Sequence, residues 1–254
     1  MSNILAIAQK ELKSYFASPI AYIVLGLFAF VYGYFYAVMF QYFMQMSMRG
    51  AMGGAPPMNV NQDMLRPIVQ NMLVVLLFVM PMITMRTYSE EKRSGTIELL
   101  LTSPVTDVQI ILGKFLGAMA LYAAMIAITV IHMLLLFSWG NPEWKVVVTG
   151  YVGLLLMGGC FISVGLLISS MTKNQIVSGM ITFAVFLLLW VVNWIASFTS
   201  PTTQSVLNYL SITDHFDDFT KGILDTKHLV YYFSVMSFGL FLTARSVDTE
   251  RWKG

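Results

Sequence analysis

Six long stretches of this chain contain no charged residue. They cover residues 14–48, 67–85, 115–142, 146–172, 174–213 and 228–244. A helix of about 20 residues crosses the hydrocarbon core of a bilayer, and each stretch can supply one. Hydrophobic residues make up 57% of the chain and charged residues only 11%, against about 25% charged in soluble domains. The stretches are continuously apolar, without the alternation of a barrel strand, so the sequence predicts an all-α integral membrane protein with six transmembrane helices.

The spans are expected near residues 19–44, 67–85, 115–137, 146–169, 176–196 and 228–244, within a single domain of residues 1–254. Residues 1–18 precede the first span, and residues 86–114 form a long loop between the second and third. Two segments on the other side are also longer than plain turns. Residues 45–66 are broken by Gly and Pro and are expected to be irregular, whereas residues 197–227 are expected to be partly helical.

Lysine and arginine are distributed unevenly between the two sides of the predicted bundle. An even number of spans places both termini on one side, which holds Lys10, Lys13, Arg86, Lys92, Arg93, Lys114, Lys173, Arg245, Arg251 and Lys253. The other side holds Arg49, Arg66, Lys145, Lys221 and Lys227. Loops rich in Lys and Arg stay in the cytoplasm. We therefore expect a multi-pass protein of the cell inner (cytoplasmic) membrane with cytoplasmic termini.

Several functional classes are disfavoured by the composition and by missing motifs. The net charge of +2 is too small to suggest a nucleic-acid partner. A single cysteine, Cys160, cannot form an intrachain disulfide. The sequence lacks a G-x-x-x-x-G-K-S/T phosphate loop and the H-E-x-x-H and G-x-S-x-G motifs. We therefore expect a non-catalytic chain, and if ATP is used, another polypeptide binds it.

Residues 3–17 have the pattern of an amphipathic helix that lies along the inner leaflet. Glu11 breaks this pattern because its angle places it inside the apolar arc. Its carboxylate either tilts out to water or meets a cation from the inner loop or from a partner. Glu11 is therefore a candidate coupling residue on the N-terminal helix.

The inner loop, residues 86–114, reads RTYSEEKRSGTIELLLTSPVTDVQIILGK. Gly95 is expected to end a helical turn, Thr96 to cap a second short helix and Pro104 to stop it. Thr106 and Gln109 have the spacing of a capping box for a helix that runs into the third span. The loop is either a compact helix–break–helix unit that projects into the cytoplasm or an ordinary solvated loop with amphipathic helices that rest on the membrane.

His132 and Asn193 are polar residues inside predicted spans. Each either hydrogen-bonds a neighbouring helix or takes part in transport, since intramembrane polar groups are functional candidates. Gly113 and Gly117 form a G-x-x-x-G pattern, which is typical of close contact between helices.

Asp214, His215, Asp217 and Asp218 have the spacing of one helix face in the outer segment. Such side chains bind metals, but a metal site needs ligands that converge and are themselves supported. We therefore expect a solvated helix face and no metal site. Phe216 and Phe219 would dock this helix on the outer membrane surface or on a gate, so the candidate extracytoplasmic gate residues are Asp214, His215, Phe216 and Phe219.

Methionine is abundant in and around the first outer segment. The residues are Met44, Met46, Met48, Met52, Met58 and Met64. Thioethers bind Cu(I), but methionine also packs adaptably in apolar surroundings. A Met-rich copper-handling membrane assembly factor is therefore one alternative function.

Three strings resemble the ABC-2-type transporter permeases, and together they cover nearly the whole chain. They are KELKSYFASPIAYIV near the start, EEKRSGTIELLLTSP followed by GKFLG in the inner loop, and SITDHFDDFTKGILD followed by a last span ending in LTARSVDTERWKG. The third string resembles the subgroup of gliding-motility and nitrous-oxide-reductase-maturation permeases.

The resemblance implies a type V exporter-like fold of six helices per subunit, paired as a homodimer or heterodimer. Each subunit would dock on a separate ABC ATPase that binds ATP and Mg, and an auxiliary extracytoplasmic subunit is a further candidate partner. The inner-loop helix would be the coupling helix. The residues that match it are Glu90, Glu91, Arg93, Gly95, Thr96, Glu98, Leu99 and Pro104.

We therefore expect the permease subunit of an ABC transporter, coupling ATP hydrolysis by a partner to export or to conformational work. Besides the copper-handling factor, the alternative is an ion-driven secondary transporter or channel. Such a protein normally places carboxylates or cations within its spans, and the predicted spans contain none.

Overall fold

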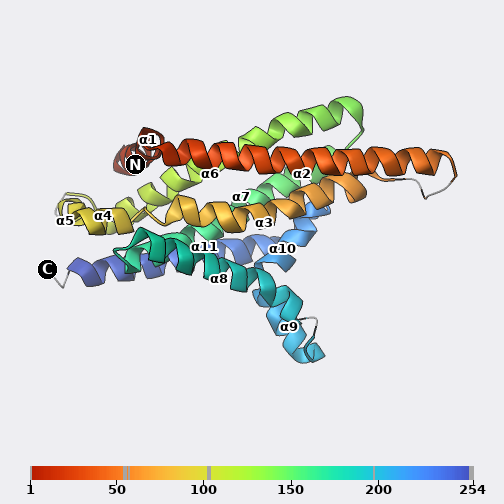
Figure 1. Ribbon diagram of the computed structural model, residues 1–254. Helices are drawn as coiled ribbons and strands as arrows, with labels where there is room; N and C mark the ends of the chain where they lie inside the picture. Colours follow the sequence, from red (N-terminus) through yellow and green to blue (C-terminus); the bar gives the residue numbers. More distant parts are fainter. Residues whose placement is uncertain (1, 54–55, 57, 102–103, 197, 252–254) are drawn as a thin grey trace.

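The computed structural model describes residues 2–53, 56, 58–101, 104–196 and 198–251, and this part of the chain is all-helical (Figure 1). Six of the described helices are long and apolar enough to cross a membrane. They are α2 (Pro19–Ala51), α3 (Arg66–Thr84), α6 (Asp107–Trp139), α7 (Trp144–Met171), α8 (Gln175–Ala196) and α11 (Thr226–Arg251). The predicted all-α architecture with six candidate spans is confirmed.

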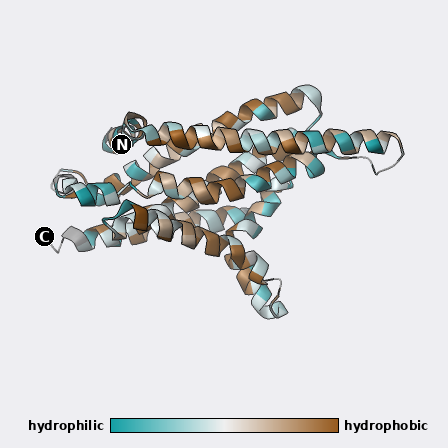
Figure 2. Ribbon diagram, in the orientation of Figure 1, coloured by the Kyte–Doolittle hydropathy of each residue, from teal (hydrophilic) through white to brown (hydrophobic). Residues whose placement is uncertain are grey.

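Both chain termini lie at one end of the bundle, which we call the termini end; the opposite end is the distal end (Figure 1). The termini end carries α1 (Ser2–Ala17), α4 (Ser89–Ser94) and α5 (Thr96–Leu101). The distal end carries a short π-helix, η1 (Val60–Leu65), together with α9 (Pro201–Leu210) and α10 (Ile212–Thr220). Apolar residues predominate along the middle of the long helices, and hydrophilic residues gather toward the two ends (Figure 2).

Helix α7 is the centre of the bundle and packs against α3, α6, α8, α10 and α11. Its glycines allow this close approach, because a Cβ at Gly158 would collide with the Tyr122 ring of α6 and one at Gly165 with Thr84 of α3. Small residues serve the same purpose at helix contacts in membranes generally. The most apolar window of α7 is 72% buried, against 17% for α2 and α8. Helices α2 and α8 therefore present most of their surface to surrounding lipid or to another protein.

Several helices are longer than the predicted spans because they continue into polar residues at their ends. Charge-free stretches predict only the part of a helix that lies in hydrocarbon, but α2, α6, α7 and α11 continue beyond it. Segment 45–66 differs most from the expected irregular loop. Helix α2 runs on to Ala51, and η1 restores helical structure from Val60, where the Asn59 side chain accepts a hydrogen bond from the backbone N–H of Asn61.

Candidate functional site

Helix α1 lies across the first turns of α6 and is separated from α2 by a sharp break. Ser18 has an extended backbone, and its hydroxyl accepts a hydrogen bond from the N–H of Ile20, so α2 starts afresh with Pro19. Gly113 and Gly117 form the floor on which α1 rests, because a Cβ at Gly113 would lie 2.6 Å from Ile7 Cβ and one at Gly117 2.7 Å from Glu11 Cβ. The predicted G-x-x-x-G contact therefore joins α6 to α1.

Four charged side chains from three elements meet at this junction, and we call them the ion cluster: Lys10 and Glu11 of α1, Glu91 of α4 and Lys114 of α6. The Lys114 Nζ lies 2.9 Å from Glu11 Oε1 and 2.8 Å from Glu91 Oε2. It also donates to the carbonyl of Thr87 at 2.9 Å. Its side chain is 0% exposed. It donates hydrogen bonds to Glu11 and to the Thr87 carbonyl, whereas its contact with Glu91 is an ion pair.

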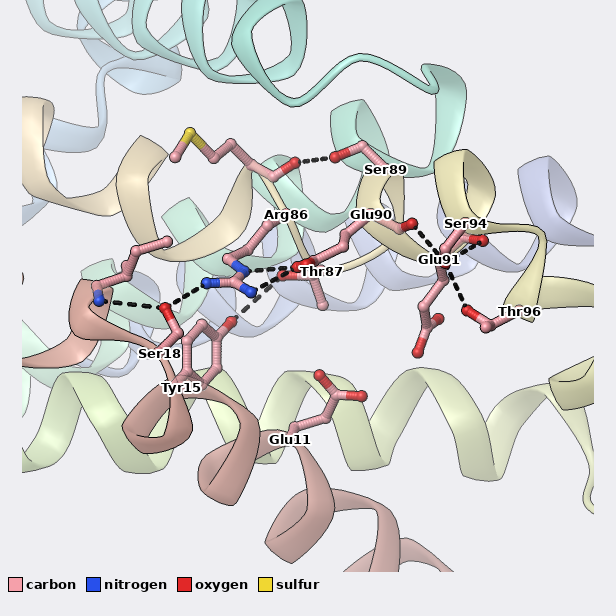
Figure 3. Close-up of polar contacts among 12 residues, drawn as sticks. Glu11, Tyr15, Ser18, Arg86, Thr87, Ser89, Glu90, Glu91, Ser94 and Thr96 are labelled. Atoms are coloured by element: carbon pink, nitrogen blue, oxygen red, sulfur yellow. Dashed lines mark hydrogen bonds and ion pairs between the residues drawn. The ribbon is translucent and has the colours of Figure 1, made fainter.

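The cluster is electrically balanced, with two cations facing two carboxylates. Lys10, whose side chain is 59% exposed, closes it from the solvent side at 3.2 Å from Glu11 and 2.9 Å from Glu91. Glu11 and Glu91 point toward one another from α1 and α4 (Figure 3). Burial alone would raise the pKa of Glu11, but Lys114 and Lys10 outweigh it and hold that pKa below its usual value. Of the two alternatives for Glu11, the structure therefore has the carboxylate paired with cations.

A second set of contacts fastens the same elements above the ion cluster (Figure 3). The Arg86 guanidinium lies 2.6 Å from Glu90 Oε2 and donates to Ser18 Oγ at 2.8 Å. The Tyr15 hydroxyl donates to the carbonyl of Ile83 at 2.9 Å. Arg86 thus ties α4 to the α1–α2 break, and Tyr15 ties α1 to the end of α3.

The inner-loop segment has the predicted helix–break–helix form. Helix α4 ends at Gly95, which adopts the left-handed conformation with φ +74°, a conformation that favours glycine. Helix α5 begins at Thr96, and Thr106 and Gln109 form the capping box of α6. The Ser169 hydroxyl of α7 accepts hydrogen bonds from the backbone N–H groups of Tyr88 and Ser89, which fixes the start of α4 on the centre of the bundle.

The residues predicted to couple to a partner divide into two groups. Arg93, Gly95, Thr96, Glu98 and Pro104 are exposed. Glu90 and Glu91 are half-buried; Glu90 pairs with Arg86, and Glu91 is turned toward α1 and α6. The side chain of Leu99 lies outside the described residues. A cavity of about 330 Å³ lies between α1 and α4, lined by Lys10, Glu11, Ser14, Tyr15, Arg86, Thr87, Glu90, Glu91, Ser94 and Thr96.

At the distal end, Asp217 joins α10 to α3. Its carboxylate lies 2.6 Å from Arg66 Nη2 and 2.6 Å from Lys221 Nζ, and accepts a hydrogen bond from Gln70 at 2.8 Å. Burial opposes ionisation, but Lys221 and Arg66 outweigh it and lower the pKa of Asp217. Asp217 is thus a structural link between two helices. The spacing of the acidic residues predicts a solvated helix face, and for Asp217 that prediction is wrong.

The four candidate gate residues occupy different environments on α10. Phe216 and Phe219 are buried, and both would touch a Cβ placed at Gly153, so they dock α10 on α7. His215 is buried beside His228, whereas Asp214 is half-buried in the wall of a cleft between α3, α8 and α10. Among the described residues, no three His, Cys, Asp or Glu side chains are grouped as metal ligands.

The remaining candidates are His132, Asn193 and the methionines of the first outer segment. His132 meets α2 through its ring, which is edge-on to Tyr32 at 5.1 Å and to Tyr36 at 5.0 Å between centroids. Its buried Nδ1 has no hydrogen-bond partner within the described residues. The side chain of Asn193 lies outside them. Met44, Met46 and Met48 are on α2, where alternate residues point in different directions, and Met64 is buried.

Lys114, Lys10 and Arg86 were missing from the residues selected by sequence reasoning. Lys114 is the last charge before a long apolar stretch and lies within the G-x-x-x-G pattern. Together with a carboxylate inside the apolar arc of the preceding amphipathic helix, this placement is the signal that could have found the pair.

The fold and this junction define a polytopic helical membrane protein whose inner-loop helices are tied to an N-terminal helix. A sequence profile described as ABC-2 family transporter protein matches residues 5–245. Because the match covers nearly the whole chain, the protein belongs to the ABC-2 transporter family.

Two curated relatives carry the same description, "Probable multidrug ABC transporter permease YbhR", one from Escherichia coli strain K12 and one from E. coli O157:H7. Each is 27% identical over 173 residues, covering 65% of this chain and 45% of the relative. The matched region thus spans less than half the length of these relatives. They give no support to the gliding-motility or nitrous-oxide-reductase-maturation subgroup, which rests on the C-terminal strings alone.

Proposed function

We propose that this chain is the non-catalytic, membrane-spanning subunit of an ABC transporter and that a separate ABC ATPase, which binds ATP and Mg, docks on α4 and α5. Family membership supports a permease, and the exposed group of inner-loop residues supplies a docking surface at the termini end. On this proposal the termini end faces the cytoplasm of a bacterial inner membrane, in agreement with the excess of Lys and Arg there.

The observation that carries the coupling role is the position of the ion cluster directly behind this docking surface. Glu91 belongs to α4 itself, Lys114 to the membrane helix α6 and Glu11 to α1. A push on α4 therefore acts on α1 and α6 through contacts shorter than 3 Å. Outward residues would select the ATPase, while inward residues would pass its movement to the spans.

A second permease subunit follows from the same proposal, because the weakly buried helices α2 and α8 leave wide apolar faces. Multidrug transport is a property named for the relatives, and export of an apolar or amphipathic substrate is the activity we carry over as a proposal. Conformational work on an auxiliary partner at the distal end is the alternative output.

The test uses membranes that contain the chain and its ATPase at matched expression. We expect the ATPase to co-purify with the wild-type chain in mild detergent. Glu98→Lys and Gly95→Trp should leave insertion intact but abolish the coupling between ATP hydrolysis and transport, because both alter the exposed surface of α4 and α5.

The matched control is Glu143→Lys, the same charge reversal at an exposed position of the distal end. It should retain both co-purification and coupling. Full coupling in the Glu98→Lys and Gly95→Trp proteins, or nucleotide turnover by the purified chain alone, would contradict the proposal.

A further inference from the structure

A continuous chain of hydrogen bonds runs through two histidines at the distal end. His215 Nε2 lies 3.0 Å from the carbonyl oxygen of Tyr209, and His215 Nδ1 lies 2.7 Å from His228 Nδ1. His228 Nε2 lies 2.9 Å from Asp218 Oδ2. The chain thus connects the last turn of α9, two positions on α10 and the first turn of α11.

Counting hydrogens gives the protonation state that this arrangement requires. A carbonyl oxygen and a carboxylate only accept hydrogen bonds, so both outer bonds need a hydrogen on the histidine nitrogen. The central bond between the two Nδ1 atoms needs one further hydrogen. Two neutral imidazoles carry two hydrogens on nitrogen, whereas three are required, so the pair holds one extra proton opposite the Asp218 carboxylate.

We propose that the His215–His228 pair is a proton-counting latch that joins α9, α10 and α11 only while it holds three protons. If one proton leaves to water, two hydrogens must serve three bonds and one bond is lost. If one proton is gained from water, two N–H groups face each other at the centre and that bond is lost. The latch therefore closes within a window of pH and opens on both sides of it.

The Asp218 carboxylate lies beside His228, and the surroundings of His215 disfavour a charge on that ring. Burial alone would raise the pKa of Asp218, but its hydrogen bonds to His228 and Lys221 outweigh burial and lower that pKa. Burial lowers the pKa of His215, and the neighbouring His228 adds to that effect. The Tyr231 ring is stacked on His215 at 3.8 Å between centroids, which holds the imidazole in place.

Other ionisable groups surround the pair on several of the elements packed against it. They are Asp214, Asp217 and Asp218 of α10, Lys221 and Asp225 in the turn that follows, Lys227, Tyr231 and Tyr232 of α11, Tyr209 of α9 and Arg66 at the start of α3. Helix α7 meets α10 at Gly153 and Thr149, and α8 lies beside it through Trp190. None of these last three side chains titrates. Among the carboxylates named above, Asp218 is the one hydrogen-bonded to the pair.

The latch matters because α9, described along its whole length, buries none of its side chains. Its C-terminal carbonyls have no partners within the helix and are capped instead from neighbouring elements. His215 caps Tyr209, while the Tyr231 hydroxyl donates to the carbonyl of Leu210 at 2.8 Å. Opening the latch removes one of the caps that place α9 against α10 and α11.

The experiment is nitrogen-15 NMR of the histidine side chains in the full chain, reconstituted in lipid nanodiscs and titrated with pH. The chain has three histidines, and His132→Asn assigns the signals of the pair by difference. At neutral pH we expect three of the four ring nitrogens of the pair to be protonated, with two at high pH and four at low pH. Two protonated nitrogens at neutral pH would overturn the proposal, and the wild type alone decides this point.

Two matched variants separate the latch from general electrostatics. The amide introduced by Asp218→Asn can donate to His228 Nε2, so this change removes the need for the third proton and should lower the upper midpoint by about one to three pH units. Asp217→Asn removes the same charge one residue away, from a carboxylate that contacts Arg66, Gln70 and Lys221. It loosens α10 on α3 but leaves the His228–Asp218 bond in place, so it should shift the upper midpoint much less than Asp218→Asn does. Equal shifts in the two variants, or no shift in Asp218→Asn, would refute the latch. The inference does not depend on ATP coupling, because the readout is made on the chain alone.

Discussion

Replacing Lys114 by methionine tests whether the ion cluster holds α1 on the bundle. The change keeps a long apolar side chain but leaves Glu11 and Glu91 with only Lys10, which is largely exposed. Removing one partner of a buried ion pair costs about 3–5 kcal/mol. Because Lys10 still contacts both carboxylates, we expect the lower limit, about 3 kcal/mol, which corresponds to roughly a hundred-fold increase in local opening.

Hydrogen exchange of the α1 amides in nanodiscs measures this opening directly. Lys13→Met is the matched control, since it removes the same charge from an exposed position of the same helix and should change stability by less than about 0.5 kcal/mol. Glu11→Gln combined with Lys114→Met restores the charge balance and should recover part of the protection. Equal α1 protection in the Lys114→Met and Lys13→Met proteins would show that the cluster does not hold the helix.

The pH dependence of the wild type provides an internal check. The pKa of Glu11 is lowered in the folded protein. Its contribution is therefore fully present above the unfolded value, about 4.3, and is lost as pH falls through the folded value. In Lys114→Met the Glu11 carboxylate has lost its buried cation, so its protonation costs less than in the wild type and the difference between the two proteins should shrink on acidification.

Two further predictions concern helix contacts. Gly117→Ala should destabilise the α1–α6 contact by about 1–3 kcal/mol, because its Cβ would lie 2.7 Å from Glu11 Cβ and 3.2 Å from the Ala8 carbonyl oxygen. Its control is Gly26→Ala, which has nothing within 4 Å of the added Cβ and should stabilise α2 by about 0.5–1 kcal/mol. The thermal unfolding midpoints of the two proteins measure this difference. Asp217→Asn should loosen the α3–α10 contact, measured as faster exchange of the α10 amides; because the pKa of Asp217 is lowered, the wild-type advantage should be present above about pH 4 and disappear as pH falls through the folded value.

The spans could be predicted because a charge in hydrocarbon is so costly that the gaps between charges mark the membrane. The helix end at Gly95 and the capping box of Thr106 and Gln109 could also be predicted, because both depend only on residues close in sequence. Helix ends beyond the membrane could not be predicted, because polar residues form helix or loop at similar cost in water. Hence the Gly- and Pro-containing segment 45–66 was expected to be irregular, although much of it is helical.

Pairings between distant residues were the other part that sequence could only indicate. For Glu11 the sequence left open whether its carboxylate meets water or a cation, because its partner Lys114 is 103 positions away. The two come together where α1 rests on Gly113 and Gly117. At the distal end, the spacing of Asp214 to Asp218 described one helix face and gave no role to His228. Gly222, with φ +85°, turns the chain so that α11 returns beside α10 and places the second histidine against the first.

The two ends of the molecule therefore differ from its middle in the kind of contact that joins helices. In the middle, α7 meets α3 and α6 through glycines. These contacts depend on close packing, because apolar side chains gain no hydrophobic energy by leaving lipid for another helix. At the ends, ion pairs and histidine bonds join the helices; Lys114 and the two histidines are buried, and only the outer members, such as Lys10, reach water. On the proposed function, movement of α4 against α1, or of α9 against α10, must therefore exchange these specific contacts, and the tightly packed α7 transmits it between the two ends as a rigid element.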